Sequence, residues 1–177
     1  MQQLLSLSLV SSLLLAVPSV ARAQEDAVIK FVDHRESMAG VTRMRVVVED
    51  TPALNRALPA AVLKEAVEQR LRDAGIEVDS TSGGRMPWLY VNVNAMETPR
   101  GFVYSAHVSF SCYLEIPTLT LDVAKFVRGE TWSSGTIGTT PPNDTRSMRK
   151  SVDDQVTAFL TVYFAANPGL SNSARLR

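Results

Sequence analysis

The sequence predicts an α+β fold: a two-layer sandwich with a mainly antiparallel sheet of about four strands and two helices on one of its faces. Three observations predict it. Apolar and polar residues alternate over two long stretches between residues 87 and 116, as in strands. Apolar residues recur every three or four positions in two other segments, 59–74 and 143–163, as in amphipathic helices. Both helical stripes and one strand face need burial, which a sheet carrying both helices on the same side provides.

The expected order of elements is β-α-β-β-β-α. The first strand is expected at 41–49, where apolar and charged side chains alternate in a way that suits an edge or near-edge position. Pro59 fits the first turn of the helix that follows, and Gly75 is expected to end that helix in the left-handed conformation. A short strand then runs from Ile76 to Val78.

The central hairpin joins two strands through Thr98-Pro99-Arg100-Gly101, where Pro presets φ for a tight turn. Alternation gives the hairpin one apolar and one polar face. The apolar face carries Leu89, Val91, Val93 and Ala95 from the first strand and Phe102, Tyr104, Ala106, Val108, Phe110, Cys112, Leu114 and Ile116 from the second. The polar face is either ordinary solvated sheet surface or a platform on which a partner docks.

The rest of the chain completes the sandwich. A further strand is expected between Ala124 and Thr139, with a bend or bulge at Arg128-Gly129. Asn143 or Asp144 is expected to cap the last helix.

Residues 1–23 are predicted to be a cleaved signal peptide. An apolar run is interrupted by Pro18, and Ala21-Arg22-Ala23 places small residues around a cleavage site after Ala23. An uncleaved membrane anchor is the alternative, although the run is short for a bilayer. Removal of 23 of the 177 residues leaves 154, a usual length for one domain. We expect a flexible arm over 24–40, a single α+β domain over 41–168 and a disordered tail over 169–177.

Charge and cysteine content exclude several classes of function. Without Arg22, 17 basic residues stand against 18 acidic ones, which argues against nucleic-acid binding. No second apolar stretch is long enough to remain as an integral membrane span after cleavage. The single cysteine, Cys112, excludes an internal disulfide, and no cysteine stands at the cleavage point for lipid attachment. The spacing of His34, His107 and Cys112 matches no metal motif, so no metal or other cofactor is expected.

The strongest candidate for function is the polar face of the hairpin together with a tryptophan further along the chain. Aromatic side chains interleaved with small polar ones are typical of recognition surfaces. The candidate binding residues are Trp88, Tyr90, Asn92, Asn94, His107, Tyr113 and Trp132. No catalytic residue is assigned, since His107 has no orienting partner in the sequence pattern and Cys112 lies on the apolar face.

Four segments carry a resemblance to known proteins: 63–76, which ends in Arg-Leu-Arg-Asp-Ala-Gly-Ile, 87–94 (Pro-Trp-Leu-Tyr-Val-Asn-Val-Asn), 131–138 (Thr-Trp-Ser-Ser-Gly-Thr-Ile-Gly) and 159–168. As a set they resemble elements of small exported bacterial proteins of uncharacterised function. The element order is similar to that of periplasmic modules such as the N-terminal domain of TolB and the LpoB type. That resemblance implies a role in envelope assembly through protein contacts, although this chain lacks the lipidation cysteine of the lipoprotein members.

Together these expectations describe an exported protein, periplasmic or secreted, that acts as a non-enzymatic binding or assembly module of the cell envelope. The polar-aromatic sheet face would bind an envelope protein or polymer. Two alternatives stay open. One is a hydrolase or transferase with a site around His107, and the other is a carrier with a small-ligand cavity between sheet and helices.

Overall fold

This computed structural model describes residues 34–52, 54, 58–79, 85–116, 125–142 and 144–170, which belong to one compact unit, Val32–Arg177. The predicted signal peptide, with its cleavage site at Ala23, and residues 171–177 of the predicted tail lie outside the described residues. The helices are α1 (His34–Met38), α2 (Ala60–Asp73) and α3 (Arg146–Ala166). The strands are β1 (Arg43–Val48), β2 (Glu77–Val78), β3 (Trp88–Thr98), β4 (Gly101–Ile116) and β5 (Lys125–Thr140).

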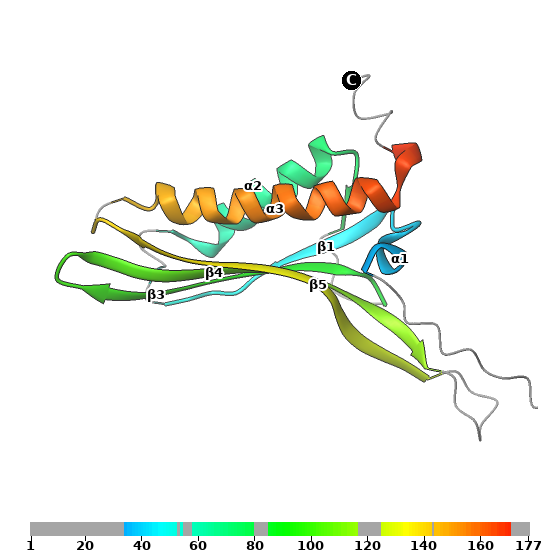
Figure 1. Cartoon of the computed structure of the whole chain (residues 1–177), viewed down its shortest axis with the longest axis horizontal. Helices are drawn as coiled ribbons and strands as arrows, with labels where there is room; N and C mark the ends of the chain where they lie inside the picture. The colour runs from blue at the N-terminus through cyan, green and yellow to red at the C-terminus, as the bar shows by residue number, and fades with distance from the viewer. Residues whose placement is uncertain are drawn as a thin grey trace, which may run out of the picture. The chain divides into compact units, whose positions relative to one another are not determined.

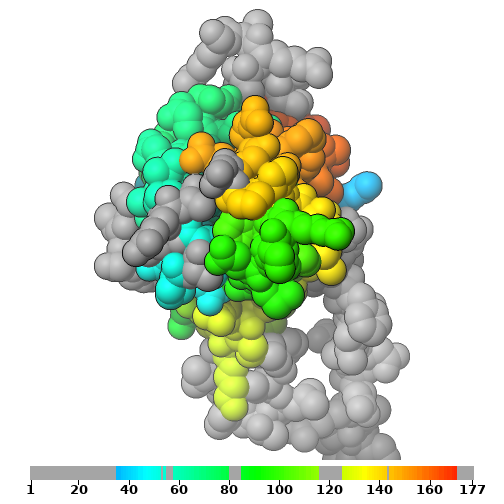
Figure 2. Space-filling view, turned by 90° about the vertical axis from the view of Figure 1, so that its left-hand side faces the viewer, coloured from blue at the N-terminus to red at the C-terminus, as the bar shows by residue number. Residues whose placement is uncertain are grey.

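The predicted α+β class is confirmed. The sheet has the strand order β2-β1-β3-β4-β5, in which β3, β4 and β5 pair antiparallel while β1 runs parallel to both of its neighbours. It has five strands where about four were predicted, and the two-residue β2, which corresponds to the short strand predicted at Ile76–Val78, forms one edge. α2 and α3 lie side by side over the same side of the sheet (Figure 1). An end-on view shows α2 in teal and α3 in orange above the green β3–β4 hairpin (Figure 2).

The core lies between the sheet and the helix layer. Alternation along β3 and β4 turns one complete strand face inward, so that Leu89, Val91, Val108 and Phe110 are fully buried. α3 supplies a stripe at helical spacing, and its buried residues are Met148, Val152, Gln155, Val156, Phe159 and Tyr163. The stripe and the strand face meet because each would otherwise expose its apolar area to water.

Two glycines hold conformations that other residues resist. Gly75 follows α2 with φ of 80°, and the N–H of Ile76 donates to the carbonyl oxygen of Leu71 at 3.0 Å. This confirms the predicted left-handed end of the helix. Gly101 closes the β3–β4 turn with φ of 132°, where a Cβ would lie 2.0 Å from the carbonyl oxygen of Thr140. A side chain at position 101 would therefore force β5 away from the hairpin.

A bulge bends the far ends of β4 and β5. The register between the two strands shifts between Phe110 and Ser111, where Thr131 on β5 has no partner on β4. The bend was predicted at Arg128-Gly129, and the structure places the irregularity at Thr131 instead. Past the bulge, the two strands curve away from the helix layer (Figure 1), which is the usual effect of an extra residue on one strand. The curvature makes the sheet face opposite the helices concave at that end.

Part of the predicted flexible arm is helical. The sequence predicted no regular structure over 24–40, but α1 forms within it and Met38 is fully buried. Beyond α3, Asn167 donates from Nδ2 to the carbonyl oxygen of Met38 at 2.9 Å and accepts the N–H of Gly40 at 2.7 Å. These bonds and the burial of Met38 tie α1 to the end of α3, a long-range contact that the polar local sequence did not indicate. Residues 24–33 lie outside the described residues.

We expect Phe159→Ala to lower the free energy of unfolding by about 3–5 kcal/mol, because it opens a cavity between α3 and the sheet. Thr161→Ala, on the exposed side of the same helix, is the matched control and should change that free energy by about 0.5 kcal/mol or less. Urea unfolding followed by circular dichroism measures both. Equal losses in the two variants would show that Phe159 is not a central core residue.

Candidate binding face

The strand register brings six of the seven predicted binding residues to one face of the sheet, which we name the polar face. Pairing of β3 with β4 sets Trp88 beside Ser111, Tyr90 beside Ser109, Asn92 beside His107 and Asn94 beside Ser105. Tyr113 continues the same alternation on β4, opposite Arg128 of β5. α2 and α3 pack on the opposite face (Figure 1), so these two helices leave the polar face uncovered.

Trp132, the seventh residue, does not lie on the polar face. Its ring packs against Phe159 of α3, with 5.4 Å between ring centroids. The bulge explains this placement. Arg128 and Glu130 point to the polar face before the bulge, and the extra residue Thr131 then reverses the alternation. Trp132 is therefore partly buried against the core, and its position does not support the prediction that it joins the binding surface.

A hydrogen-bonded network crosses the middle of the polar face. Glu49, just after β1, accepts hydrogen bonds from the hydroxyl of Tyr90 and from the side-chain amide of Asn92, which in turn accepts one from the amide of Asn94. The bond from Tyr90, followed by that from Asn92, lowers the pKa of the Glu49 carboxyl. The same bond raises the pKa of Tyr90. The network fixes the orientation of polar groups that a partner would meet.

Trp88 is a largely buried residue of the polar face, and two arginines and a tyrosine contact its ring. It is only 8% exposed, which leaves little of its ring free for a partner. The guanidinium carbons of Arg45 and Arg128 lie 5.9 and 5.2 Å from its ring centroid, and the ring of Tyr113 packs edge-on at 6.0 Å. Arginines from β1 and β5 thus meet on a ring from β3.

A polar hollow of about 430 Å³ opens beside Trp88, at the concave end of the polar face. Its charged groups are Arg45, Arg128 and Glu130. Ser109, Ser111 and Tyr113 also line it, together with Val47, Trp88 and Tyr90. Such a group of cations and hydroxyls can bind a polar ligand.

The charged residues of this face were missed by sequence reasoning. Alternation along 41–49 places Arg45 and Glu49 on a common face, but it does not reveal that β1 lies parallel to β3 and beside Trp88. Arg128 was noted only as part of an expected bend. Its approach to Trp88 depends on the register of β5, which no local pattern specifies across a bulge.

The His107 side chain lies against the neighbouring strand, β5. His107 pairs with Asn92 on one side and Gly135 on the other, and a Cβ at Gly135 would lie 3.6 Å from the Cδ2 atom of the imidazole. The ring therefore lies over the backbone of β5. Within the described ranges, no group of three or more His, Cys, Asp or Glu side chains could hold a metal ion. Cys112 is buried on the apolar face as predicted, and burial raises the pKa of its thiol.

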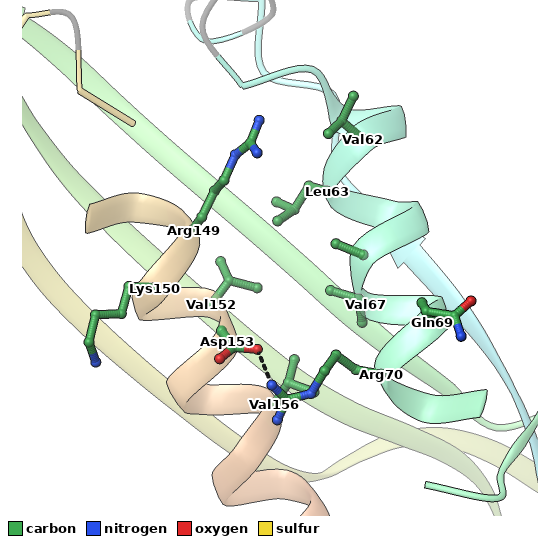
Figure 3. A pocket seen from close by; sticks show the side chains of 11 residues that line it. Val62, Leu63, Val67, Gln69, Arg70, Arg149, Lys150, Val152, Asp153 and Val156 are labelled. Atoms are coloured by element: carbon green, nitrogen blue, oxygen red, sulfur yellow. Dashed lines mark hydrogen bonds and ion pairs between the residues drawn. The ribbon is translucent and has the colours of Figure 1, made fainter. Parts of the chain in front are cut away.

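A second hollow, of about 490 Å³, lies between α2 and α3 (Figure 3). Val67 from α2 and Val152 and Val156 from α3 line it, and Arg70 crosses it to pair with Asp153 at 2.6 Å. The carrier alternative required a cavity between the sheet and the helices, whereas this hollow is a groove between the two helices themselves.

Comparisons with known proteins leave the family of this chain open. No protein-family model matches it, and no curated protein matches it. Among solved structures, a match is the rare lipoprotein B from Shewanella oneidensis, which is 13% identical, covers 75% of this chain and 95% of that chain, and has a TM-score of 0.20. Similarity at that level carries no argument about fold or function. In the part of the chain that the structure describes, no helix combines the length and apolar content needed to cross a membrane.

The Glu49 network predicts that removal of the Tyr90 hydroxyl changes the pKa of Glu49. Because the Tyr90 hydroxyl is the first cause of the low Glu49 pKa, Tyr90→Phe should raise that pKa toward the ordinary value of 4.5. A lowered folded-state pKa stabilises the fold above the unfolded pKa, and this contribution is lost as pH falls through the folded pKa. The variant should therefore have a smaller contribution from Glu49, and it should have lost that contribution completely at a higher pH than the wild type.

Carboxyl-detected NMR titration of Glu49 measures this effect. Tyr113→Phe removes a hydroxyl from the same face without touching Glu49 and serves as the control. The same Glu49 pKa in wild type and Tyr90→Phe would show that the bond is not formed in solution.

Proposed function

We propose that this chain is an exported, non-enzymatic binding module of the cell envelope that takes an envelope protein or polymer on its polar face. The observation that carries the proposal is the strand register. It gathers polar and aromatic side chains from β1, β3 and β4 on one face while α2 and α3 occupy the other. The side-chain network on that face also holds hydrogen-bonding groups in fixed positions, as a recognition surface needs.

The hairpin end of the polar face adds an exposed apolar patch. Met96 of β3, Val103 of β4 and Ile137 of β5 lie near one another on this face and are 65%, 37% and 82% exposed. Covering such side chains is favourable by about 25 cal/mol per Å² of apolar area removed from water. Arginines and tyrosines at the opposite end are residue types that often dominate interface energies. Apolar, amide-rich and cationic parts thus follow one another along a single face, as in a surface that recognises an extended partner.

The envelope location rests on the sequence. Residues 1–23 have the apolar run and the small residues before Ala23 that predict export, and this stays a prediction. Export would bring the polar face into contact with envelope proteins and polymers.

Replacing Tyr90 and Ile137 together tests the proposal. We expect Tyr90→Ala/Ile137→Asn to reduce capture of the partner from the protein's own envelope extract roughly tenfold or more, because it removes contacts at two points of the polar face. Mass spectrometry quantifies what is recovered with each variant. The control is Val62→Ala/Arg149→Ala, which changes two exposed residues of the helix layer and should recover as much partner as the wild type.

Circular dichroism verifies that both double variants fold. A partner recovered equally with wild type and the polar-face variant would place binding elsewhere on the molecule. Recovery lost only with the helix-layer variant would identify the groove between α2 and α3 as the docking surface instead.

A further inference from the structure

Three arginines at the concave end of the polar face lie against aromatic rings. Arg45 and Arg128 lie on the ring of Trp88, and the guanidinium carbon of Arg85 is 4.0 Å from the ring centroid of Phe126. Within the described ranges, none of the three makes an ion pair. Four arginines elsewhere are paired with carboxylates: Arg43 with Glu77, Arg70 with Asp153, Arg72 with Glu68 and Arg146 with Asp144.

The aromatic contacts hold these charges in place, and among the described residues no side-chain hydrogen bond of the three guanidinium groups is formed. A guanidinium stacks on a ring through its flat face, which keeps its N–H groups free at its edge. Arg45 shows the consequence most directly: its Nε is buried and has no hydrogen-bond partner among the described residues. A buried donor without an acceptor is costly, so an acceptor from outside the chain would be favoured there.

The groups around Arg45 and Arg128 indicate which chemical class of ligand would supply that acceptor. The hollow beside them carries the hydroxyls of Ser111 and Tyr113, which can both donate and accept hydrogen bonds. A guanidinium fork matches the two oxygens of a carboxylate or phosphate. The hollow also contains the Glu130 carboxylate. This group can accept hydrogen bonds from ligand hydroxyls, but it repels negative charge on the ligand, so a ligand group with two charges is repelled more than one with a single charge.

We propose that this hollow binds an anionic sugar, with its carboxylate or phosphate on Arg45 and Arg128 and its hydroxyls on Ser111, Tyr113 and Glu130. This inference rests on the proposed function, and it names the ligand class for one end of the polar face. An acidic polysaccharide or a phosphorylated saccharide of the envelope would present this chemistry. Glu130 favours a carboxylate, which carries a single charge per group, over a phosphate monoester, which carries close to two.

NMR of the purified protein tests the proposal through its two tryptophans. Trp88 supports the hollow and Trp132 packs on α3, so their indole N–H signals report separately, and Trp132→Phe assigns them. The probes are trigalacturonic acid, glucose 6-phosphate, inorganic phosphate and neutral maltotriose. We expect trigalacturonic acid to shift the Trp88 signal and leave the Trp132 signal unchanged. Glucose 6-phosphate should act more weakly, inorganic phosphate more weakly still, and maltotriose should have no effect.

Two variants with opposite effects sharpen the test. Arg128→Gln should weaken trigalacturonic acid binding roughly 10- to 100-fold, because it removes a charge-assisted contact to the ligand. Glu130→Gln should strengthen binding, since it removes the repelling carboxylate. Arg149→Gln removes one positive charge from an exposed site on the helix layer and should bind like the wild type. Added salt should weaken binding, as expected for a partly exposed ionic contact.

Several outcomes would overturn the proposal. Equal binding of maltotriose would exclude recognition of charge, and equal binding of inorganic phosphate and both sugars would exclude recognition of a sugar. An unchanged affinity in Arg128→Gln would move the site away from Trp88. If no probe binds while Tyr90→Ala/Ile137→Asn still loses the envelope partner, the anionic-sugar inference fails and the proposed function stands. If the sugar binds but capture of the partner is unaffected by that double variant, the captured partner binds elsewhere, and only the sugar-binding end of the polar face is retained from the proposed function.

Discussion

The contact of Phe159 with Phe110 and Trp132 decides which side of the sheet is buried. The centroid of the Phe159 ring lies 5.6 Å from that of Phe110 and 5.4 Å from that of Trp132, at the centre of the interface between α3 and the sheet. Because strand side chains alternate strictly, fixing Phe110 inward fixes every neighbour on β3 and β4 as well. The polar side chains then have no position except on the opposite face. The position of the candidate binding surface is in this sense a consequence of how the core packs.

The bulge at Thr131 adds the second constraint. After the bulge, Trp132 faces the helix layer, whereas before the bulge Arg128 and Glu130 lie on the polar face. The bulge also curves β4 and β5 away from the helices, so that this end of the polar face becomes concave around Trp88 (Figure 1). One extra residue therefore explains both the aromatic packing under α3 and the hollow in which Arg45 and Arg128 meet.

Local patterns predicted the elements well. The hairpin followed from alternation, α2 and α3 from helical spacing, and the end of α2 from Gly75, because each depends on residues close in sequence. The six hairpin residues of the candidate surface were found for the same reason.

Features that depend on long-range register were not predictable. The placement of Trp132 required knowledge of the bulge, and the approach of Arg45 to Trp88 required the parallel pairing of β1 with β3. α1 was missed because its order comes from contacts with Asn167, far along the chain. A polar local sequence does not indicate a contact with a residue so far along the chain.

The central claim is that the polar face is where this protein meets its envelope partner. Hydroxyl-radical footprinting of the protein, purified and within its own envelope, tests this most directly, since Met96, Tyr113 and Ile137 are exposed reporters on that face and Val62 is one on α2. The account predicts that oxidation of the three polar-face residues falls in the envelope while oxidation of Val62 is unchanged. Protection of Val62 with unchanged oxidation of the polar face would contradict it.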